Sequence, residues 1–341
     1  MRHLVFGLSP DAASFKRLGF DCLDASVRVH LEDILRVFVA GYNAALQLDD
    51  HEGVSRQLES TYDRHHVGFA FEGAGMGYAL FDLLAPWSRS RLRAFTDGAG
   101  RRHDYIATVG AGFAVARVPW GIAVLPRYLQ NLDAAVAWCV WDGYGFHQGI
   151  FHHERFLDPR GGPPAAVPAY ARPLFDSGLA RSLWWAAGAS PARIARAIDR
   201  FPEARRAEMW CGIGVAAAYA GGVDEGILPE LLERSGAYAV DFLSGLPFAA
   251  RMRQKGENPS AWTERACRQL LDMTADEAAD LIVRHVAEVS AAWEGREQDM
   301  REQGYARLRH RLRRACERQG NEEPWPVGAS HAGKAYGRQE S

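Results

Sequence analysis

The chain has 341 residues, of which 48% are hydrophobic and 24% are charged, and its formal net charge is -2 at pH 7. These values are typical of globular proteins and indicate a sizeable hydrophobic core, which argues against a largely disordered chain. The basic residues are spread along the chain and balanced by acidic ones, so the clustered Lys and Arg that mark a nucleic-acid-binding domain are missing.

The cysteines and the apolar segments indicate the compartment. The five cysteines are widely spaced and include no CxxC pair. Neither a disulfide framework nor a zinc ribbon fits this spacing, and we expect reduced, buried thiols. The longest apolar segment, residues 67–87, contains Glu72 and Asp82, and acidic residues are costly inside a bilayer. With no signal peptide evident at the N-terminus, the sequence predicts a cytoplasmic, soluble protein.

Helical periodicity dominates the chain. Residues 31–48 place apolar side chains three or four positions apart, as on one face of a helix. Ser190 followed by Pro191 is typical of a helix start, and Thr274 with Glu277 matches a capping box. No stretch shows the alternation of apolar and polar residues that marks a half-buried strand. The sequence therefore predicts an all-α fold.

Glycine is unusually frequent inside these helical runs. The chain has 34 glycines, and Gly73, Gly75 and Gly77 lie within one apolar run. Glycine costs about 1 kcal/mol against alanine in a helix interior, so repeated glycines predict either close helix–helix approach or bends. A dinucleotide-binding glycine motif needs a strand before it. Because this run lies in mid-helix, we expect no nucleotide cofactor.

Weak internal similarity predicts a tandem repeat. Three blocks match in order at offsets of 137, 141 and 135 residues. The matched blocks are 38–46 with 175–183, 73–79 with 214–220, and 110–114 with 245–249. We infer two glycine-rich helical units, about 31–120 and 172–256, related by a pseudo-twofold axis. The interface between such units is a natural place for an elongated cavity.

The predicted organisation is a single helical domain over residues 1–320. A central segment, 135–157, joins the two units, and C-terminal helices span 260–318. The polar, proline-containing tail, 321–341, is expected to be disordered.

The central segment and the first glycine run carry the candidate catalytic residues, Glu72, Asp142 and His147. One hypothesis is a metal site. His147, His152 and Glu72 offer nitrogen and carboxylate ligands that suit iron or manganese. The spacing of five between the histidines is poor for one helical face, which favours ligands from two helices, or histidines that merely pack.

Acid–base catalysis is the second hypothesis for this segment. His147 can titrate near neutral pH and move a proton, with Asp142 orienting its ring. In the structural alternative, Asp142 caps a helix and His147 satisfies a buried carbonyl group.

Six further residues are candidates for substrate binding. They are Trp141, Tyr144, Asp176, Arg181, Trp184 and Arg205. The aromatic rings either line a pocket for a conjugated substrate or belong to the core. The arginines either contact a carboxylate or the phosphopantetheine of a carrier protein, or have a structural role.

A basic, amphipathic helix is expected over residues 296–318. Leu308 and Leu312 share one face of it, and arginines surround them. Such a helix could dock on an acidic carrier protein, another partner or an anionic membrane surface, or it could be a solvated last helix.

Six blocks together resemble a family known as a domain of unknown function, number 1702. They are Phe69-Ala-Phe-Glu-Gly-Ala-Gly-Met, Val109-Gly-Ala-Gly-Phe-Ala, Trp141-Asp-Gly-Tyr-Gly-Phe-His, Leu174-Phe-Asp-Ser-Gly-Leu-Ala-Arg-Ser-Leu-Trp, Phe201-Pro-Glu-Ala-Arg-Arg and Ala218-Tyr-Ala-Gly-Gly. The resemblance runs from about residue 31 to 280. It implies a gene context in bacterial enediyne clusters, beside the iterative polyketide synthase, and it supplies no catalytic residues.

This context predicts an accessory protein of enediyne-type polyketide biosynthesis. It would hold a long polyene or polyyne between the repeats and oxidise, dehydrogenate, cyclise or isomerise it, with the polyketide synthase or a carrier protein as a partner. The alternative is a non-catalytic protein that sequesters the product, giving self-resistance, or a scaffold for other pathway proteins. An enzyme predicts that Glu72, Asp142 and His147 converge on one pocket.

Overall fold

The computed structural model describes residues 5–48, 50–85, 87 and 90–322. Every regular element in these ranges is a helix and none is a strand, which confirms the predicted all-α class. Residues 321 and 322 still belong to the last helix. The rest of the predicted tail, 323–341, lies outside the described residues.

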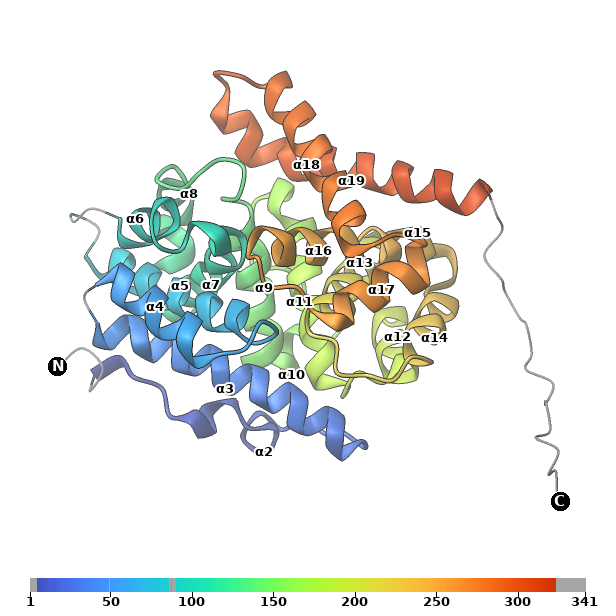
Figure 1. Ribbon diagram of the computed structural model, residues 1–341, viewed down its shortest axis with the longest axis horizontal. Coiled ribbons are helices and arrows are strands. Elements are labelled where there is room, and N and C mark those ends of the chain that lie inside the picture. Colours follow the sequence, from blue (N-terminus) through green and yellow to red (C-terminus); the bar gives the residue numbers. More distant parts are fainter. Residues whose placement is uncertain (1–4, 49, 86, 88–89, 323–341) are drawn as a thin grey trace, which may run out of the picture.

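Six long helices form a row in which each packs against the next. Figure 1 shows the later members following one another across the molecule. The row consists of α3 (Ala25–Gln47), α5 (Val67–Leu84), α7 (Asp104–Arg117), α9 (Cys139–Phe151), α11 (Arg172–Ala186) and α13 (Glu203–Tyr219). It continues into α15 (Ala239–Leu243) and α16 (Leu246–Lys255), which both contact α13.

Short helices connect successive members of the row. They are α4 (His51–Thr61), α6 (Arg91–Asp97), α8 (Gly121–Leu129), α10 (His153–Phe156), α12 (Pro191–Asp199) and α14 (Ile227–Ser235). Single turns of 3-10 helix complete the connections at Arg101–His103, Ala169–Ala171 and Gly236–Tyr238. The architecture is therefore a repeat of one long and one short helix.

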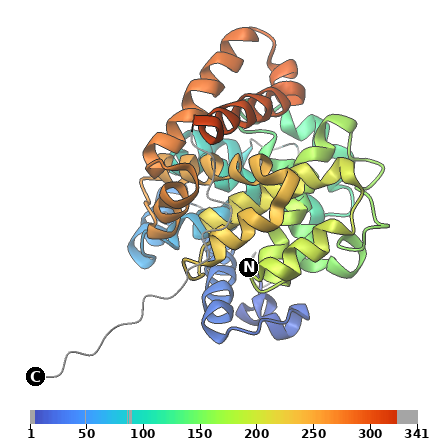
Figure 2. The ribbon, with the colours of Figure 1, turned by 90° about the vertical axis from the view of Figure 1, so that its right-hand side faces the viewer.

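The two ends of the chain cover opposite sides of the row (Figures 1 and 2). At the N-terminal end, the 3-10 helix Pro10–Ala13 packs on α3 and is followed by α2 (Phe15–Leu18). At the C-terminal end, α17 (Ala261–Leu271) packs on α13, α18 (Ala275–Ala292) on α16, and α19 (Glu297–Glu322) on α15 and α18.

Glycine makes the row possible, as the sequence predicted. A Cβ atom added to Gly73 on α5 would lie 1.9 Å from the carbonyl oxygen of Phe38 on α3, and one added to Gly41 would lie 1.9 Å from that of Ala70. Each glycine of the pair thus contacts the carbonyl three residues before the other. No side chain fits at such a distance, so only glycine permits this approach.

The same reciprocal contact recurs at later interfaces of the row. The pairs are Gly75 with Gly110, Gly112 with Gly143, Gly145 with Gly178, and Gly214 with Gly245. Between α11 and α13, Gly212 contacts the carbonyl of Ser177, which places Ala180 in the partner position. Each long helix of the row has one small residue that faces the next helix. Consecutive residues of this kind, from Gly41 to Gly214, are 33 to 37 positions apart in the sequence.

The repeating element is therefore shorter than the predicted unit. The predicted offsets of 135 to 141 residues span four steps of this repeat. In two of the three matched blocks, the predicted equivalence of residues is shifted by two positions from the equivalence that the glycine contacts define. The contacts make Phe38 equivalent to Ser177, whereas the matched block pairs it with Phe175. The contacts mark no boundary between two halves, and the pseudo-twofold division stays a prediction.

The predicted helix starts are found at two of the expected positions. Thr274 and Glu277 form a capping box at the start of α18, and α12 begins at Pro191 with Ser190 as its cap. The helix predicted over 31–48 begins earlier, at Ala25, because the Asp24 side chain accepts hydrogen bonds from the first backbone amides. Among the described residues, no helix combines the length and apolar character that crossing a bilayer requires.

Candidate functional site

Two buried acids occupy equivalent positions of the repeat. Glu72 on α5 and Asp142 on α9 each lie three residues before the glycine that faces the next helix. Ser177 holds the same position on α11. The row therefore aligns these three side chains along one line through its centre, where the helices approach most closely. The Gly-x-Gly spacing is visible in the sequence, but the alignment of these side chains can be inferred from it only when the pairing of the helices is known.

The charge of Asp142, the second acid in this line of side chains, is neutralised by Arg181. Arg181 on α11 donates a hydrogen bond to its Oδ1, and the hydroxyl of Ser177 donates one to Oδ2 at 3.1 Å. The guanidinium also lies 4.6 Å from the centre of the Phe146 ring. Burial raises the pKa of Asp142, and Arg181 opposes that rise by stabilising the carboxylate. The result is a buried ion pair between α9 and α11.

Glu72 has no such partner. Its side chain is 2% exposed, and its Oε1 atom is buried without a hydrogen bond from any described residue. Burial raises the pKa of Glu72 to about 8, although Arg181 acts in the opposite direction. At neutral pH this carboxyl is therefore mostly protonated and can donate a proton.

Glu72 faces an apolar cavity of about 50 Å³. Its walls come from α3, α5, α7, α9, α11 and the N-terminal segment 8–18. The aromatic lining residues are Phe38, Phe69, Phe113, Phe146, Phe151 and Trp185. Among the described residues that line it, Glu72 and Arg117 are the only charged ones.

Asp142 faces a different cavity, of about 40 Å³, on the other side of the line. Ser177 and Arg181 line it too, together with Cys139, Cys211 and other mostly apolar side chains. Burial raises the pKa of both thiols. The two predicted catalytic acids are thus electrostatically coupled through Arg181 but face separate cavities.

A larger, open vestibule of about 960 Å³ adjoins the Glu72 cavity. Residues common to both walls are Leu8, Ala12, Leu18, Arg117, Ile150 and Phe151. Tyr144, a predicted binding residue, lines the vestibule with His152 and His153. The cavity holding the acid is therefore next to a space large enough for a small molecule.

His147 lies beside the cavity wall without lining it. Its ring centre is 5.5 Å from that of Phe113 and 4.8 Å from that of Phe151, and both ring nitrogens are buried without a hydrogen bond from a described residue. Burial, together with the charges of Arg117 and His152, lowers its pKa to about 3. This differs from the expected titration near neutral pH, because the surrounding rings exclude water from the imidazole.

The residues proposed for a metal site are spread out. His152 is exposed on the vestibule, with its ring centre 5.8 Å from that of His147, while Glu72 faces the inner cavity. Within the described ranges, no three His, Cys, Asp or Glu side chains are grouped so that they could hold one metal ion.

The remaining predicted binding residues have structural contacts. Asp176 accepts hydrogen bonds from Nε and Nη2 of Arg205 at 3.1 and 2.6 Å, and Arg205 also donates to the carbonyl of Gly161 at 2.8 Å. Trp184 donates to the carbonyl of Gly221 at 3.1 Å. Trp141 is fully buried in the core. The Asp176–Arg205 pair ties α11 to α13.

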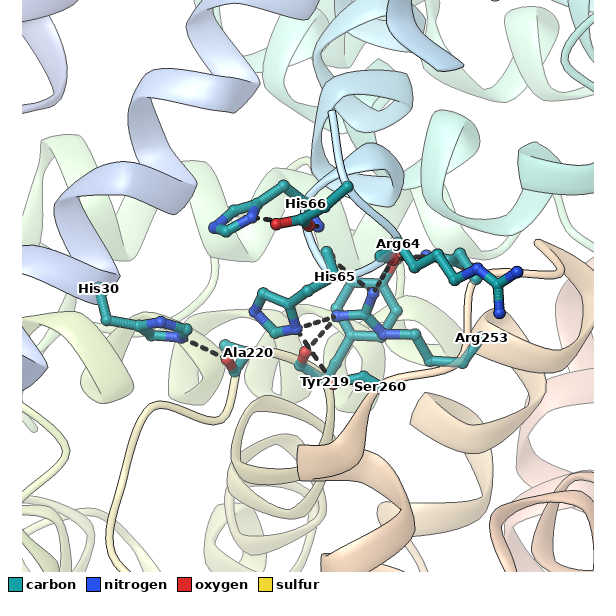
Figure 3. A network of polar contacts seen from close by, with 10 residues as sticks. His30, Arg64, His65, His66, Tyr219, Ala220, Arg253 and Ser260 are labelled. Atoms are coloured by element: carbon teal, nitrogen blue, oxygen red, sulfur yellow. Dashed lines mark hydrogen bonds and ion pairs between the residues drawn. The ribbon is translucent and has the colours of Figure 1, made fainter. Parts of the chain in front are cut away.

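Sequence reasoning missed a second polar cluster, around Arg253 on α16 (Figure 3). The buried guanidinium donates to the carbonyls of His65 and Tyr219 at 2.7 and 2.6 Å and lies 4.0 Å from the Tyr219 ring centre. His65 bonds Ser260 at 3.0 Å, and the ring centre of His30 is 5.2 Å from that of His65. Arg253 thereby joins the loop before α5 to the end of α13. No motif in the sequence marks it.

The C-terminal helix uses its apolar face internally. Leu308 and Leu312 are buried, and Arg309 donates hydrogen bonds to Asp241 at 2.9 Å and Ser244 at 2.6 Å. The apolar face of this helix, which the sequence left as either a docking face or part of a solvated last helix, therefore packs on the body of the protein.

These features define an all-helical repeat protein with an enclosed carboxylic acid beside an open vestibule. The chain belongs to the family described as "Protein of unknown function (DUF1702)", whose sequence profile matches residues 1–316. No curated protein and no solved structure matches the chain significantly.

Proposed function

We propose that this protein binds a long unsaturated chain in the vestibule and the Glu72 cavity, and isomerises it by proton transfer, as an accessory protein of enediyne-type polyketide biosynthesis. The observation that carries the proposal is Glu72. A protonated, unpartnered carboxyl facing aromatic walls next to an open vestibule is arranged to act on an apolar ligand. The biosynthetic context rests on the resemblance to the enediyne-associated family.

One carboxyl group is sufficient for such an isomerisation. One oxygen of Glu72 donates its proton to the terminal unsaturated carbon at one end of a conjugated system, and the other oxygen accepts a proton from the saturated carbon next to the opposite end. The double bonds shift, the carboxyl is regenerated, and no electrons leave the substrate. Positive charge that develops on the chain is stabilised by nearby aromatic rings such as Phe113 and Phe146.

The inner cavity must open for this ligand. It is about 50 Å³, smaller than the roughly 150 Å³ cavity that holds benzene in an engineered protein. The N-terminal segment forms one wall and is held on α3 by Asn43, which pairs with the backbone of Leu8 at 3.0 and 2.8 Å. Displacing this segment enlarges the cavity toward the vestibule.

The test combines binding with isotope exchange. We expect a long-chain conjugated tetraene to bind, and Val39→Phe, which fills the cavity, to abolish binding. Val124→Phe on α8, an exposed position outside the cavity, is the matched control. In heavy water the wild type should introduce deuterium into the tetraene, whereas Glu72→Gln should bind it without exchange. Binding without exchange by the wild type would overturn the catalytic proposal.

A non-catalytic binding function is the second candidate. It is favoured by the separation of the predicted catalytic residues, since Asp142 is paired with Arg181 and His147 lies outside the cavity. In that case the protein sequesters the unsaturated chain, and the exchange experiment gives the wild type and Glu72→Gln the same result.

A further inference from the structure

The mouth of the vestibule is strongly basic, although the whole chain has a net charge of -2. Of the residues that the structure describes, four Lys or Arg side chains line the vestibule, against one acidic side chain, Glu154. The basic residues are Lys16 and Arg17 on α2, Arg117 at the end of α7 and Arg155 on α10.

These four cations are not neutralised by ion pairs. Several other arginines of this protein are, as Arg205 is by Asp176 and Arg309 by Asp241. Within the described part of the chain, Lys16, Arg17, Arg117 and Arg155 have no carboxylate within ion-pair distance, and all four side chains are exposed. Such an excess of like charge is repulsive, and an anion that enters the vestibule relieves that repulsion.

The apolar cavity lies directly behind this basic mouth. Arg117 and Phe151 line both spaces, so a ligand that contacts Arg117 with one end reaches the aromatic walls with the other. Phe151 is 37% exposed, so its ring is accessible from the vestibule. The order along this path is cations, then aromatic rings, then the Glu72 carboxyl.

We propose that the ligand is an amphiphile with an anionic head group, a carboxylate or a phosphate, bound by Lys16, Arg17, Arg117 and Arg155, and an apolar chain directed toward Glu72. This inference rests on the proposed function and specifies its substrate class. The head group fixes the depth to which the chain enters, and therefore which atoms of the chain lie at Glu72.

The test compares a long-chain conjugated tetraene carboxylic acid with its methyl ester, using the fluorescence change on binding. We expect the acid to bind the wild type about tenfold more tightly, since several partly screened charges each contribute a modest factor. Raising the ionic strength should weaken binding of the acid and leave the ester unaffected. The Arg17→Gln, Arg117→Gln double variant should remove most of the acid's advantage without changing the affinity for the ester.

Arg284→Gln, Arg314→Gln provides the matched control. It removes the same net charge from exposed positions on α18 and α19, on the side of the molecule opposite α2 (Figure 1). The inference is overturned if the wild type binds acid and ester with equal affinity. It is also overturned if the control variant loses as much affinity for the acid as the Arg17→Gln, Arg117→Gln variant does. If neither compound binds, the proposed function itself fails.

Competition with alkyl chains of equal length identifies the source of the anion. Stronger displacement of the tetraene acid by the alkyl phosphate assigns the mouth to a phosphate-bearing acyl carrier group. Stronger displacement by the alkyl carboxylate assigns it to the free acid. If the uncharged alkyl ester displaces the tetraene acid as strongly as the two anionic compounds do, the vestibule contains no anion site.

Discussion

Arg181 on α11 and Asp142 on α9 form a buried ion pair that lies within electrostatic reach of Glu72. The pair lines one of two interior cavities, and Glu72 faces the other. On one side the carboxylate of Asp142 is neutralised, and on the other the carboxyl of Glu72 is left protonated without a partner. This difference makes Glu72 the one strong candidate for proton transfer among the residues described.

Breaking this ion pair should destabilise the protein strongly. Arg181→Met leaves Asp142 buried without its counter-charge, which costs about 3–5 kcal/mol of unfolding free energy. Urea denaturation at neutral pH measures the change. Arg234→Met, which breaks an exposed pair with Glu230 on α14, should cost less than about 0.5 kcal/mol. Equal losses for the two variants would show that the Asp142–Arg181 pair contributes little.

Glu72 should make the stability of the protein decrease as the pH rises. Its pKa is raised in the folded state to about 8, while the unfolded carboxyl titrates near 4.5. Above pH 4.5 the unfolded chain gives up this proton and the folded one keeps it, so the unfolded state is favoured increasingly up to about pH 8. The loss is on the order of 5 kcal/mol. Glu72→Gln should abolish this component of the pH dependence, as measured by denaturation at pH 5, 7 and 8.

The buried histidines should produce the opposite dependence on the acid side. Burial and the charge of Arg253 lower the pKa of His65 to about 3, whereas the unfolded imidazole titrates near 6.5. Stability is therefore lost as the pH falls below 6.5, because only the unfolded chain takes up the proton. His65→Gln should recover about 3 kcal/mol of the loss at pH 4.5. His310→Gln, at an exposed position on α19, is the control substitution.

The glycine contacts should tolerate no side chain. A Cβ on Gly110 would lie 1.9 Å from the carbonyl oxygen of Glu72, so Gly110→Ala forces α5 and α7 apart and should cost about 3 kcal/mol or more. Gly226→Ala is the matched control, since nothing lies within 4 Å of the added atom and its backbone is helical. Thermal denaturation compares the two, and similar melting temperatures would mean that the row adjusts easily.

Much of the helical content followed from local patterns in the sequence. Periodic apolar residues, the Thr274 capping box and the start at Pro191 predict helices because their causes act within a few residues. Close helix packing was also predictable, because interior glycines that weaken an isolated helix have a physical reason only where another backbone approaches. Glu72, Asp142 and His147 were singled out by chemical type alone.

Tertiary structure decided how these residues relate to one another. Which helix each glycine faces depends on pairing over 31 to 35 residues, and that pairing aligns Glu72 with Asp142 while leaving His147 on another face of α9. The pKa values follow from burial, which no local pattern encodes. The basic mouth likewise arises only when α2, α7 and α10 come together around one vestibule, since its residues are separated by up to about 140 positions in the chain. The sequence by itself therefore determined the helices and their tight packing, and the tertiary structure determined which charges meet and which remain alone.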